Sequence, residues 1–165
     1  MGGSWEDSYT GQLRKRVGHQ KLIIPSVRAV ILNEQGDALY IARRGEGSWG
    51  MPAGSIELEE TIFQCLQREV LEETGLRVLS AVPFAVYTSP DLSITNRFGD
   101  AYQLFEFAFR VEEWTGELVQ ETDETVGAKF FPLDDVPEIR DPFWKTHHER
   151  VIADLKAFQG QLLLK

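Results

Sequence analysis

The segment 54–76 constrains the fold of this chain most strongly, because it predicts one short helix with a defined beginning and end. Thr61 followed by Gln64 three residues later is typical of a capping box at a helix N-terminus. Gly75 stands where a left-handed glycine commonly ends a helix. Apolar residues recur at every fourth position in between, at Ile62, Leu66 and Val70. The sequence therefore predicts a helix over residues 61–74 with one face buried in a core.

A second face of this helix is acidic. Glu72 and Glu73 follow Glu69 by three and four positions, so both carboxylates are neighbours of the Glu69 carboxylate on one side of the helix. Like charges at this spacing repel one another, and a divalent cation would relieve that repulsion. Ligand sets made only of oxygen favour the hard ions Mg²⁺ and Mn²⁺. An acidic run is more often a solvated helix face, however, so this pattern alone leaves both interpretations open.

The spacing of the whole segment favours the metal site. Residues 54–76 read G-x5-E-x7-R-E-aliphatic-x-E-E-x-G-aliphatic, and every specified position is filled. This pattern resembles the box of the Nudix hydrolase superfamily, which includes the MutT-like enzymes. Residues 49–54 resemble the W-x-x-P-G-G segment that precedes the box in that family, and they differ at Ala53, where glycine is usual. If the backbone there needs a positive φ, alanine would strain it.

The resemblance implies an α+β fold, a Nudix α/β/α sandwich with a mixed β-sheet between helices, and a single domain over residues 1–165. The elements predicted from the sequence are strands at 27–32, 38–42, 101–111 and 129–133, an extended segment at 76–88, an N-terminal helical extension within 1–20 and a C-terminal helix at 141–160.

Local signals predict how some of these elements begin and pair. The turn at 33–37 predicts that the first two strands form a hairpin. Ser4 is predicted to cap the N-terminal helix, and Asp141 the C-terminal one. Residues 101–111 alternate, with Phe105, Phe107 and Phe109 on one face and Tyr102, Leu104, Glu106 and Ala108 on the other, which predicts a strand with one strongly buried face.

The resemblance also implies an activity. Nudix enzymes hydrolyse a diphosphate bond in a nucleoside diphosphate linked to another moiety, with Mg²⁺, or Mn²⁺ as its substitute. No marker of a substrate-specific subfamily is present, since Leu92 stands where some ADP-ribose hydrolases carry proline. The default substrate is therefore a (deoxy)nucleoside triphosphate. The alternatives are an ADP-ribose, nucleotide-sugar or dinucleoside polyphosphate hydrolase, a module that binds a nucleotide metabolite without turnover, and an isomerase on the same fold.

The residues that carry this chemistry follow from the resemblance, position by position. Glu69, Glu73, Glu72 and the backbone carbonyl of Ala53 are the implied metal ligands. Glu69, Glu72, Arg68, Glu60 and Glu124 are the implied catalytic groups, with Arg68 orienting the glutamates and either Glu69 or Glu124 serving as base. Arg43, Arg44 and Arg97 are candidates to hold phosphates.

Other reactive side chains are expected to be structural. Tyr102 and Phe98 could stack on a nucleobase, but packing is the commoner role for such residues. His147 and His148 have no evident ligand partner on the last helix, so we expect both to be structural. Cys65, the one cysteine, is expected to be a small buried residue rather than a nucleophile.

The net charge of −9 at first disfavours every anionic partner. Residues 54–76 alone hold six acidic residues and one arginine, however, which is the charge a metal site needs. The charge therefore disfavours nucleic acid as a partner, but it is compatible with the small nucleotide that the resemblance implies, provided that Mg²⁺ accompanies it. No apolar run suggests a membrane span, and the lone cysteine with no leader-like segment predicts a cytoplasmic location. A homodimer is possible, as is common in the family.

Overall fold

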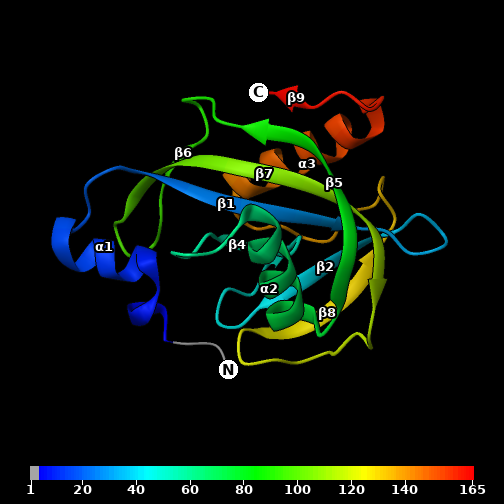
Figure 1. Cartoon of the computed structure of the whole chain (residues 1–165), viewed down its shortest axis with the longest axis horizontal. Helices are drawn as coiled ribbons and strands as arrows, with labels where there is room; N and C mark the ends of the chain where they lie inside the picture. Colours follow the sequence, from blue (N-terminus) through cyan, green and yellow to red (C-terminus); the bar gives the residue numbers. More distant parts are fainter. Residues whose placement is uncertain (1–3) are drawn as a thin grey trace.

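The computed structural model describes residues 4–165 (Figure 1). Its helices are η1 (Trp5–Asp7), α1 (Tyr9–Val17), α2 (Ile62–Thr74) and α3 (Pro142–Ala157). Its strands are β1 (Leu22–Ile31), β2 (Ala38–Arg43), β3 (Trp49–Gly50), β4 (Ala53–Ser55), β5 (Arg77–Tyr87), β6 (Ser93–Thr95), β7 (Ala101–Thr115), β8 (Thr125–Phe131) and β9 (Leu163–Leu164).

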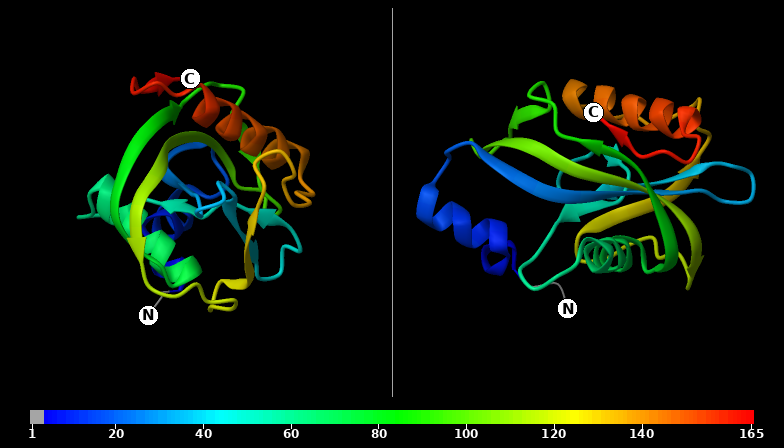
Figure 2. Two further views of the ribbon diagram at one scale, coloured as in Figure 1. Left: turned by 90° about the vertical axis from the view of Figure 1, so that its right-hand side faces the viewer. Right: turned by 45° about the horizontal axis from the view of Figure 1, so that its top comes forward.

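The strands form two sheets. The larger has six strands in the order β4-β1-β7-β5-β9, with β6 added to β7, and the smaller has the order β3-β2-β8. β1 runs parallel to β7, with Leu22 beside Tyr102 and Ile31 beside Val111, whereas β5 runs antiparallel to β7. Figure 2 shows α3 on one side of these strands and α2 on the other. This mixed sheet between helices confirms the predicted α+β sandwich.

The predicted hairpin of strands 27–32 and 38–42 is wrong. β1 pairs with β4 and β7 in the larger sheet, whereas β2 pairs with β3 and β8 in the smaller one. One isolated bridge, between Leu32 and Ala38, is what joins the two segments. The predicted turn is therefore present, but it joins a strand of the larger sheet to a strand of the smaller one. The predicted strand 129–133 is also displaced, because β8 covers 125–131 to match β2.

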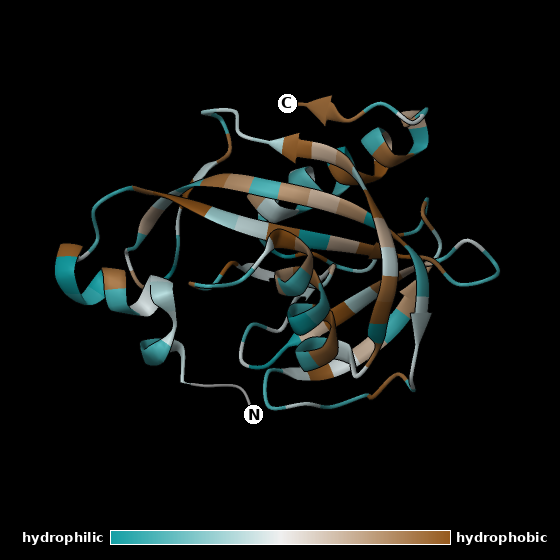
Figure 3. Ribbon diagram, in the orientation of Figure 1, coloured by the Kyte–Doolittle hydropathy of each residue, from teal (hydrophilic) through white to brown (hydrophobic). Residues whose placement is uncertain are grey.

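α2 begins and ends as predicted. The Thr61 hydroxyl accepts a hydrogen bond from the Gln64 amide while the Gln64 side chain accepts one from the Thr61 amide, and Gly75 follows with φ of 77°. Leu66 and Val70 are buried in one core with Val27, Ile41 and Phe109. Figure 3 shows both hydrophobic and hydrophilic residues along this helix. Its hydrophilic residues include Arg68, Glu69, Glu72 and Glu73.

The terminal helices differ from prediction in their ends. Ser8, not Ser4, caps α1, because its hydroxyl accepts a hydrogen bond from the Gly11 amide, while Ser4 caps the short η1. Residues 1–3 of the predicted extension lie outside the described residues. Asp141 caps α3 as predicted, but the helix ends at Ala157 rather than near Gly160. No helix within residues 4–165 is both long enough and apolar enough to span a membrane.

β7 has one strongly buried face, as the alternation predicts. Phe105 is 37% exposed, although Phe109 is buried. The opposite face, with Leu104, Glu106 and Ala108, is the one buried throughout. It forms a core with Phe84, Val151 and other residues of β5 and α3. This face includes a charged residue, Glu106, which is buried with partners that come from distant parts of the chain.

Candidate active site

The acidic face of α2 lies directly against β4. A Cβ atom on Gly54 would fall 1.9–2.2 Å from the three carboxyl atoms of Glu69, far inside van der Waals contact. The Glu69 carboxylate therefore occupies the space that any larger residue at position 54 would fill. The glycine that opens the box pattern is thus required by a close approach to a side chain, and its φ is not positive.

Arg68 holds three of the glutamates together. Its Nε donates to Glu60 Oε1 at 2.8 Å, and its Nη1 donates to Glu69 Oε1 at 2.6 Å and to Glu72 Oε2 at 3.3 Å. Its Nη2 reaches the Ser55 carbonyl at 3.0 Å. One guanidinium group therefore fixes these carboxylates to each other and to β4, which is the orienting role that the resemblance implies for it.

Glu73 is fully buried beside Ala53. Its Oε2 accepts a hydrogen bond from the Ala53 amide at 3.0 Å. Its Oε1 lies 2.6 Å from Arg43 Nη1, yet no hydrogen bond of good geometry reaches this oxygen. Arg43 Nη2 also donates to the Ala53 carbonyl at 2.8 Å. Ala53 has no positive φ, so the alanine is unstrained in the place where the family usually has glycine.

Burial outweighs the two arginines in its effect on the pKa values of these carboxyl groups. Burial, together with the charge of Glu73, raises the pKa of Glu69 to about 8, although Arg68 opposes this. Burial raises the pKa of Glu73 to about 7 despite Arg43 and the Ala53 amide, and Glu124 adds to the rise. Two acids that hold protons near neutral pH are unusual in a folded domain and are typical of functional sites.

The donor set fits a hard divalent cation. Glu69, Glu73 and the Ala53 carbonyl supply only oxygen, and Glu73 Oε1 is a buried oxygen that still lacks a hydrogen bond. Within residues 4–165, no three His, Cys, Asp or Glu side chains converge closely enough to hold an ion as they stand. Arg43 and Arg68 instead contact these carboxylates. Their guanidinium groups supply the positive charge that an ion could share.

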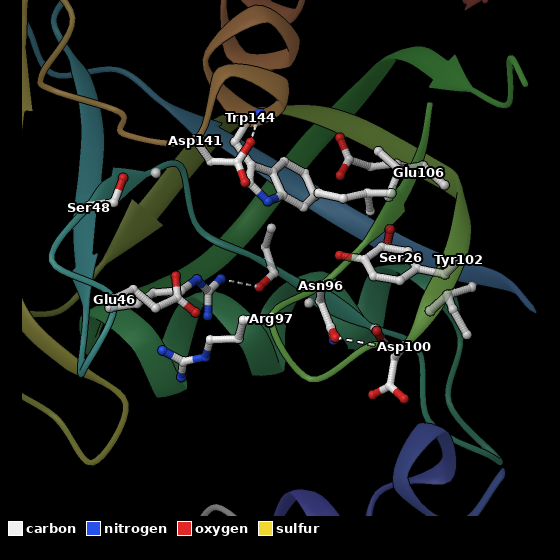
Figure 4. A pocket seen from close by; sticks show the side chains of 18 of the residues that line it. Ser26, Glu46, Ser48, Asn96, Arg97, Asp100, Tyr102, Glu106, Asp141 and Trp144 are labelled. Carbon is white, nitrogen blue, oxygen red and sulfur yellow. Dashed lines mark hydrogen bonds between the residues drawn. The ribbon is translucent and has the colours of Figure 1, made fainter. Parts of the chain in front are cut away.

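A cleft of about 550 Å³ opens beside this cluster (Figure 4). It meets the cluster at Arg43, Ala53 and Gly54. Its other walls come from β1, β7, the loops 44–48 and 95–100, the start of α3, and the N-terminal helices. This volume lies within the range of small-molecule sites, roughly 300–1,000 Å³.

A buried polar network forms part of the cleft floor. Arg28 donates two hydrogen bonds to Glu106, at 2.9 and 3.0 Å, and His147 Nε2 lies 2.8 Å from the same carboxylate. Although burial alone would raise it, Arg28 and His147 hold the pKa of Glu106 well below its usual range. The Trp144 ring lies over Arg28 at 5.5 Å. The network therefore keeps a charged pair rigid under the cleft.

His148 connects this network to the segment before α2. Its Nδ1 lies 2.7 Å from the Trp144 carbonyl, which accepts, so Nδ1 carries the proton. Its Nε2 then accepts from the Met51 amide at 3.0 Å and from Arg28 Nη1 at 3.0 Å. Burial and the nearby Arg28 lower the pKa of His148 to about 3, so the ring is neutral. His148 is therefore structural, as expected, and it holds segment 49–54 in place.

Replacing His148 by phenylalanine is expected to destabilise the fold. The change removes the acceptor and leaves the Met51 amide and one Arg28 N–H buried without a partner, which costs about 1–3 kcal/mol. Urea unfolding measures this loss. His19→Phe is the control, because His19 contacts Asp100 from a mostly exposed position and should change stability by about 1 kcal/mol or less. Equal stability of His148→Phe and the wild type would contradict this role.

The other predicted residues divide between the cleft and its surroundings. Arg97, Tyr102 and Phe98 line the cleft, and Tyr102 also packs against the core. Arg97 Nη1 donates to the Gly45 carbonyl at 3.3 Å and thereby joins two cleft loops. Burial raises the pKa of the Cys65 thiol, as expected for a thiol that is not a nucleophile.

Arg44 and Glu124 belong to a neighbouring loop. Arg44 does not line the cleft; its Nη2 binds Glu121 at 2.8 Å and the Thr122 carbonyl at 2.9 Å. It therefore fastens loop 121–125 rather than pointing to where a phosphate would lie. Glu124 is exposed, and its charge acts on both Glu73 and Arg43. The structure thus brings Glu124 near the acidic cluster.

Sequence reasoning missed Arg28, Glu106 and His148 as parts of the site. Arg28 lies 78 residues from Glu106 and 120 from His148 in the chain, so no local spacing links them. The one available signal was a charged residue at each of two strand positions otherwise flanked by apolar residues. A buried charge requires a partner, which could have suggested that the two strands meet.

Comparisons with known proteins agree with this geometry. A family model described as the NUDIX domain matches residues 22–155. A human protein named 8-oxo-dGDP phosphatase NUDT18 is 33% identical over 140 residues, which are 81% of this chain and 40% of that protein. An ADP-ribose pyrophosphatase of Methanocaldococcus jannaschii is 28% identical over 127 residues, 75% of this chain and 68% of that one. This chain thus spans less than half the length of the human relative.

Solved structures show the same fold. The crystal structure of a MutT NUDIX hydrolase from Burkholderia pseudomallei superposes with a TM-score of 0.63 and 25% identity. The match covers 79% of this chain and 98% of that one.

Proposed function

This chain belongs to the Nudix hydrolase family, and from that premise we propose that it hydrolyses a diphosphate bond in a nucleoside diphosphate linked to another group, with Mg²⁺ as cofactor. The observation that carries the proposal is the pair Glu69 and Glu73, buried at the edge of the cleft with raised pKa values. An anionic substrate can approach such a site only if cations neutralise the carboxylates.

The residues divide the chemistry among them. Glu69, Glu73 and the Ala53 carbonyl would hold the ion, with Glu72 sharing it. When bound, Mg²⁺ would neutralise the diphosphate and favour attack by water. Arg68 and Glu60 keep the carboxylates in position through their hydrogen bonds. Glu69 or Glu124 would accept the proton of the attacking water.

Phosphate contacts come from the arginines of the cleft. Arg43 and Arg97 both line it, from β2 and from the loop before β7. Each guanidinium group can give paired hydrogen bonds to phosphate oxygens. Arg44 is left out of this set, because it is engaged with loop 121–125.

The names of two relatives favour a narrower class of substrate than the sequence alone. The relatives reported above are named for 8-oxo-dGDP and for ADP-ribose, which both contain a nucleoside diphosphate. We therefore place a nucleoside diphosphate or its conjugate ahead of the nucleoside triphosphate expected by default. The partner remains a small nucleotide rather than a nucleic acid.

A substrate panel tests the activity. The protein is incubated with Mg²⁺ or Mn²⁺ and 8-oxo-dGDP, ADP-ribose, a nucleotide sugar, a dinucleoside polyphosphate or each nucleoside triphosphate, and the products are separated by chromatography. We expect a nucleoside monophosphate from at least one of the first four. Binding without turnover of any compound would favour the non-catalytic module and overturn the proposal.

Mg²⁺ is expected to stabilise the protein more at high pH than at low pH. Because Glu69 and Glu73 have raised pKa values in the fold, their contribution to stability is present below the ordinary value of 4.5 and is lost as pH rises through about 7 and 8. A bound cation offsets the charges that then appear. Melting temperatures with Mg²⁺ and with EDTA should therefore differ more near about pH 8.5 than near about pH 5.5. Shifts of equal size at both pH values would contradict this expectation. Samples with NaCl at the same ionic strength serve as the control for a general salt effect.

A further inference from the structure

The N-terminal helices cover one end of the cleft. They precede residues 22–155, which match the family model. Arg14 of α1 is buried and donates to the Gln20 carbonyl at 2.6 Å and to the Ala101 carbonyl at 2.7 Å. Glu57, just before α2, accepts from the Tyr9 amide at 2.8 Å. α1 is thus fastened both to the start of β7 and to the loop that leads into the acidic helix.

Two exposed aromatic side chains line the cleft. Among residues 4–165, three Phe or Trp side chains are exposed: Trp5 (58%), Phe98 (67%) and Phe105 (37%). Two of them, Trp5 and Phe98, line the cleft. Apolar rings left exposed in a cleft are typical of surfaces that bind a ligand.

Contacts within the protein hold the backbone of Trp5 and the ring of Phe98. The Trp5 carbonyl accepts from the Ser8 hydroxyl at 2.6 Å. A Cβ atom on Gly11 would lie 2.1 Å from this carbonyl oxygen, so α1 and η1 are packed as closely as glycine permits. The guanidinium carbon of Arg97 lies 4.8 Å from the centre of the Phe98 ring. The backbone at Trp5 and the ring of Phe98 are therefore held before any ligand binds, which lowers the entropy that binding costs.

The cleft has a second aromatic end. Trp144 lines it, and the guanidinium carbon of Arg28 lies 5.5 Å from the centre of its ring. Figure 4 shows Trp144 and Asp141 on one side, and Asn96, Arg97 and Asp100 on the side toward the N-terminal helices. The cleft meets the acidic cluster at Ala53 and Gly54. Aromatic groups at both ends, with arginines and a cation site beside them, match a molecule that has a ring at each end of a diphosphate.

On these observations we propose that Trp5 and Phe98 form a second ring-binding subsite for the group attached to the nucleoside diphosphate. The inference rests on the proposed function and deepens it, because it selects diphosphates with two ring groups over nucleoside di- and triphosphates. The ligand chemistry is a ring with a flat apolar face. A sugar and a second nucleobase both offer such a face.

Binding of uncleavable analogues to the full chain tests the subsite. Isothermal titration with Mg²⁺ compares α,β-methylene-ADP with α,β-methylene-ADP-ribose and with the methylene analogue of diadenosine diphosphate. The same three are used with guanine in place of adenine. We expect the wild type to bind at least one two-ring analogue about ten-fold more tightly than the matching nucleoside diphosphate analogue. Whichever two-ring analogue binds more tightly, the ADP-ribose type or the dinucleoside type, identifies the second ring as a sugar or a base.

Variants then assign the effect to the aromatic pair. Trp5→Ala is expected to weaken the preferred two-ring analogue about ten-fold, and at least five times more than the nucleoside diphosphate analogue. Trp5→Phe should retain affinity within about three-fold, since a ring remains. Phe98→Ala leaves α1 intact and should weaken the same analogue. Arg16→Ala is the control, because Arg16 is exposed on α1 and does not line the cleft.

Three results would overturn the subsite: no preference of the wild type for either two-ring analogue, no loss in Trp5→Ala and Phe98→Ala, or equal losses for all analogues. Failure of the proposed function looks different. In that case the wild type cleaves no nucleotide in the substrate panel, while the titrations still report whether Trp5 and Phe98 contact a second ring.

Discussion

Replacing Glu73 by glutamine should lower kcat by about two to three orders of magnitude while leaving the fold intact, the scale seen when one electrostatic group is removed from an active site. Glu73 is fully buried, and its carboxylate joins Arg43 to the Ala53 amide. Glutamine has the same shape and can still accept from that amide. It cannot supply the negative charge that a cation and Arg43 both require.

Steady-state kinetics over a range of Mg²⁺ concentrations measures the loss, and thermal unfolding verifies the fold. Glu34→Gln is the matched control, because Glu34 is exposed in the turn between β1 and β2. Its kcat should equal that of the wild type. Wild-type activity of Glu73→Gln in excess Mg²⁺ would remove Glu73 from the ligand set, and loss of cooperative unfolding would show that the residue is mainly structural.

The parts of the fold that the sequence predicted well depend on neighbouring residues. The ends of α2 follow from Thr61, Gln64 and Gly75, all within one short segment, and the structure confirms each. The apolar stripe of that helix is equally local, since its members lie one turn apart. Such elements need no knowledge of the rest of the chain.

Strand pairing could not be predicted in the same way. The turn at 33–37 is a local signal, and it suggested a hairpin. The partners of these strands are β7 and β8, which follow about 70 or more residues later and whose register is set by both sheets together. A similar separation in the chain explains why the burial of Glu106 could not be predicted. Its burial is possible only because Arg28 and His147 arrive from β1 and α3.

The candidate site shows the same division. The spacing of Glu69, Glu72 and Glu73 on one helix predicted an acidic cluster, and the structure adds that Arg68 binds two of them and Arg43 the third. The arginines at 43 and 44 are adjacent in sequence and were predicted to act alike. Arg43 is the last residue of β2 and lines the cleft, whereas Arg44 lies in the turn that follows and binds loop 121–125.

Replacing Gly54 by alanine should reduce kcat/KM by about two orders of magnitude through Glu69 alone. The new methyl group would lie about 2 Å from the Glu69 carboxyl atoms, and the carboxylate is the flexible end of its side chain. Glu69 would therefore rotate away, break its 2.6 Å contact with Arg68, and leave the place where it would meet a cation. The backbone at Gly54 has no positive φ, so alanine fits the chain itself and stability should change little.

Gly50→Ala provides the matched control for this prediction, because it adds the same methyl group to the same wall of the cleft. A Cβ atom there would lie 3.4 Å from His148 Nε2, an ordinary contact, so activity should stay near that of the wild type. Kinetics of both variants, with thermal unfolding for each, separates a local effect on Glu69 from a general effect of crowding the segment 49–54. If Gly54→Ala were as active as Gly50→Ala, the position of the Glu69 carboxylate would not matter for the reaction, and its assignment as a ligand or base would fail.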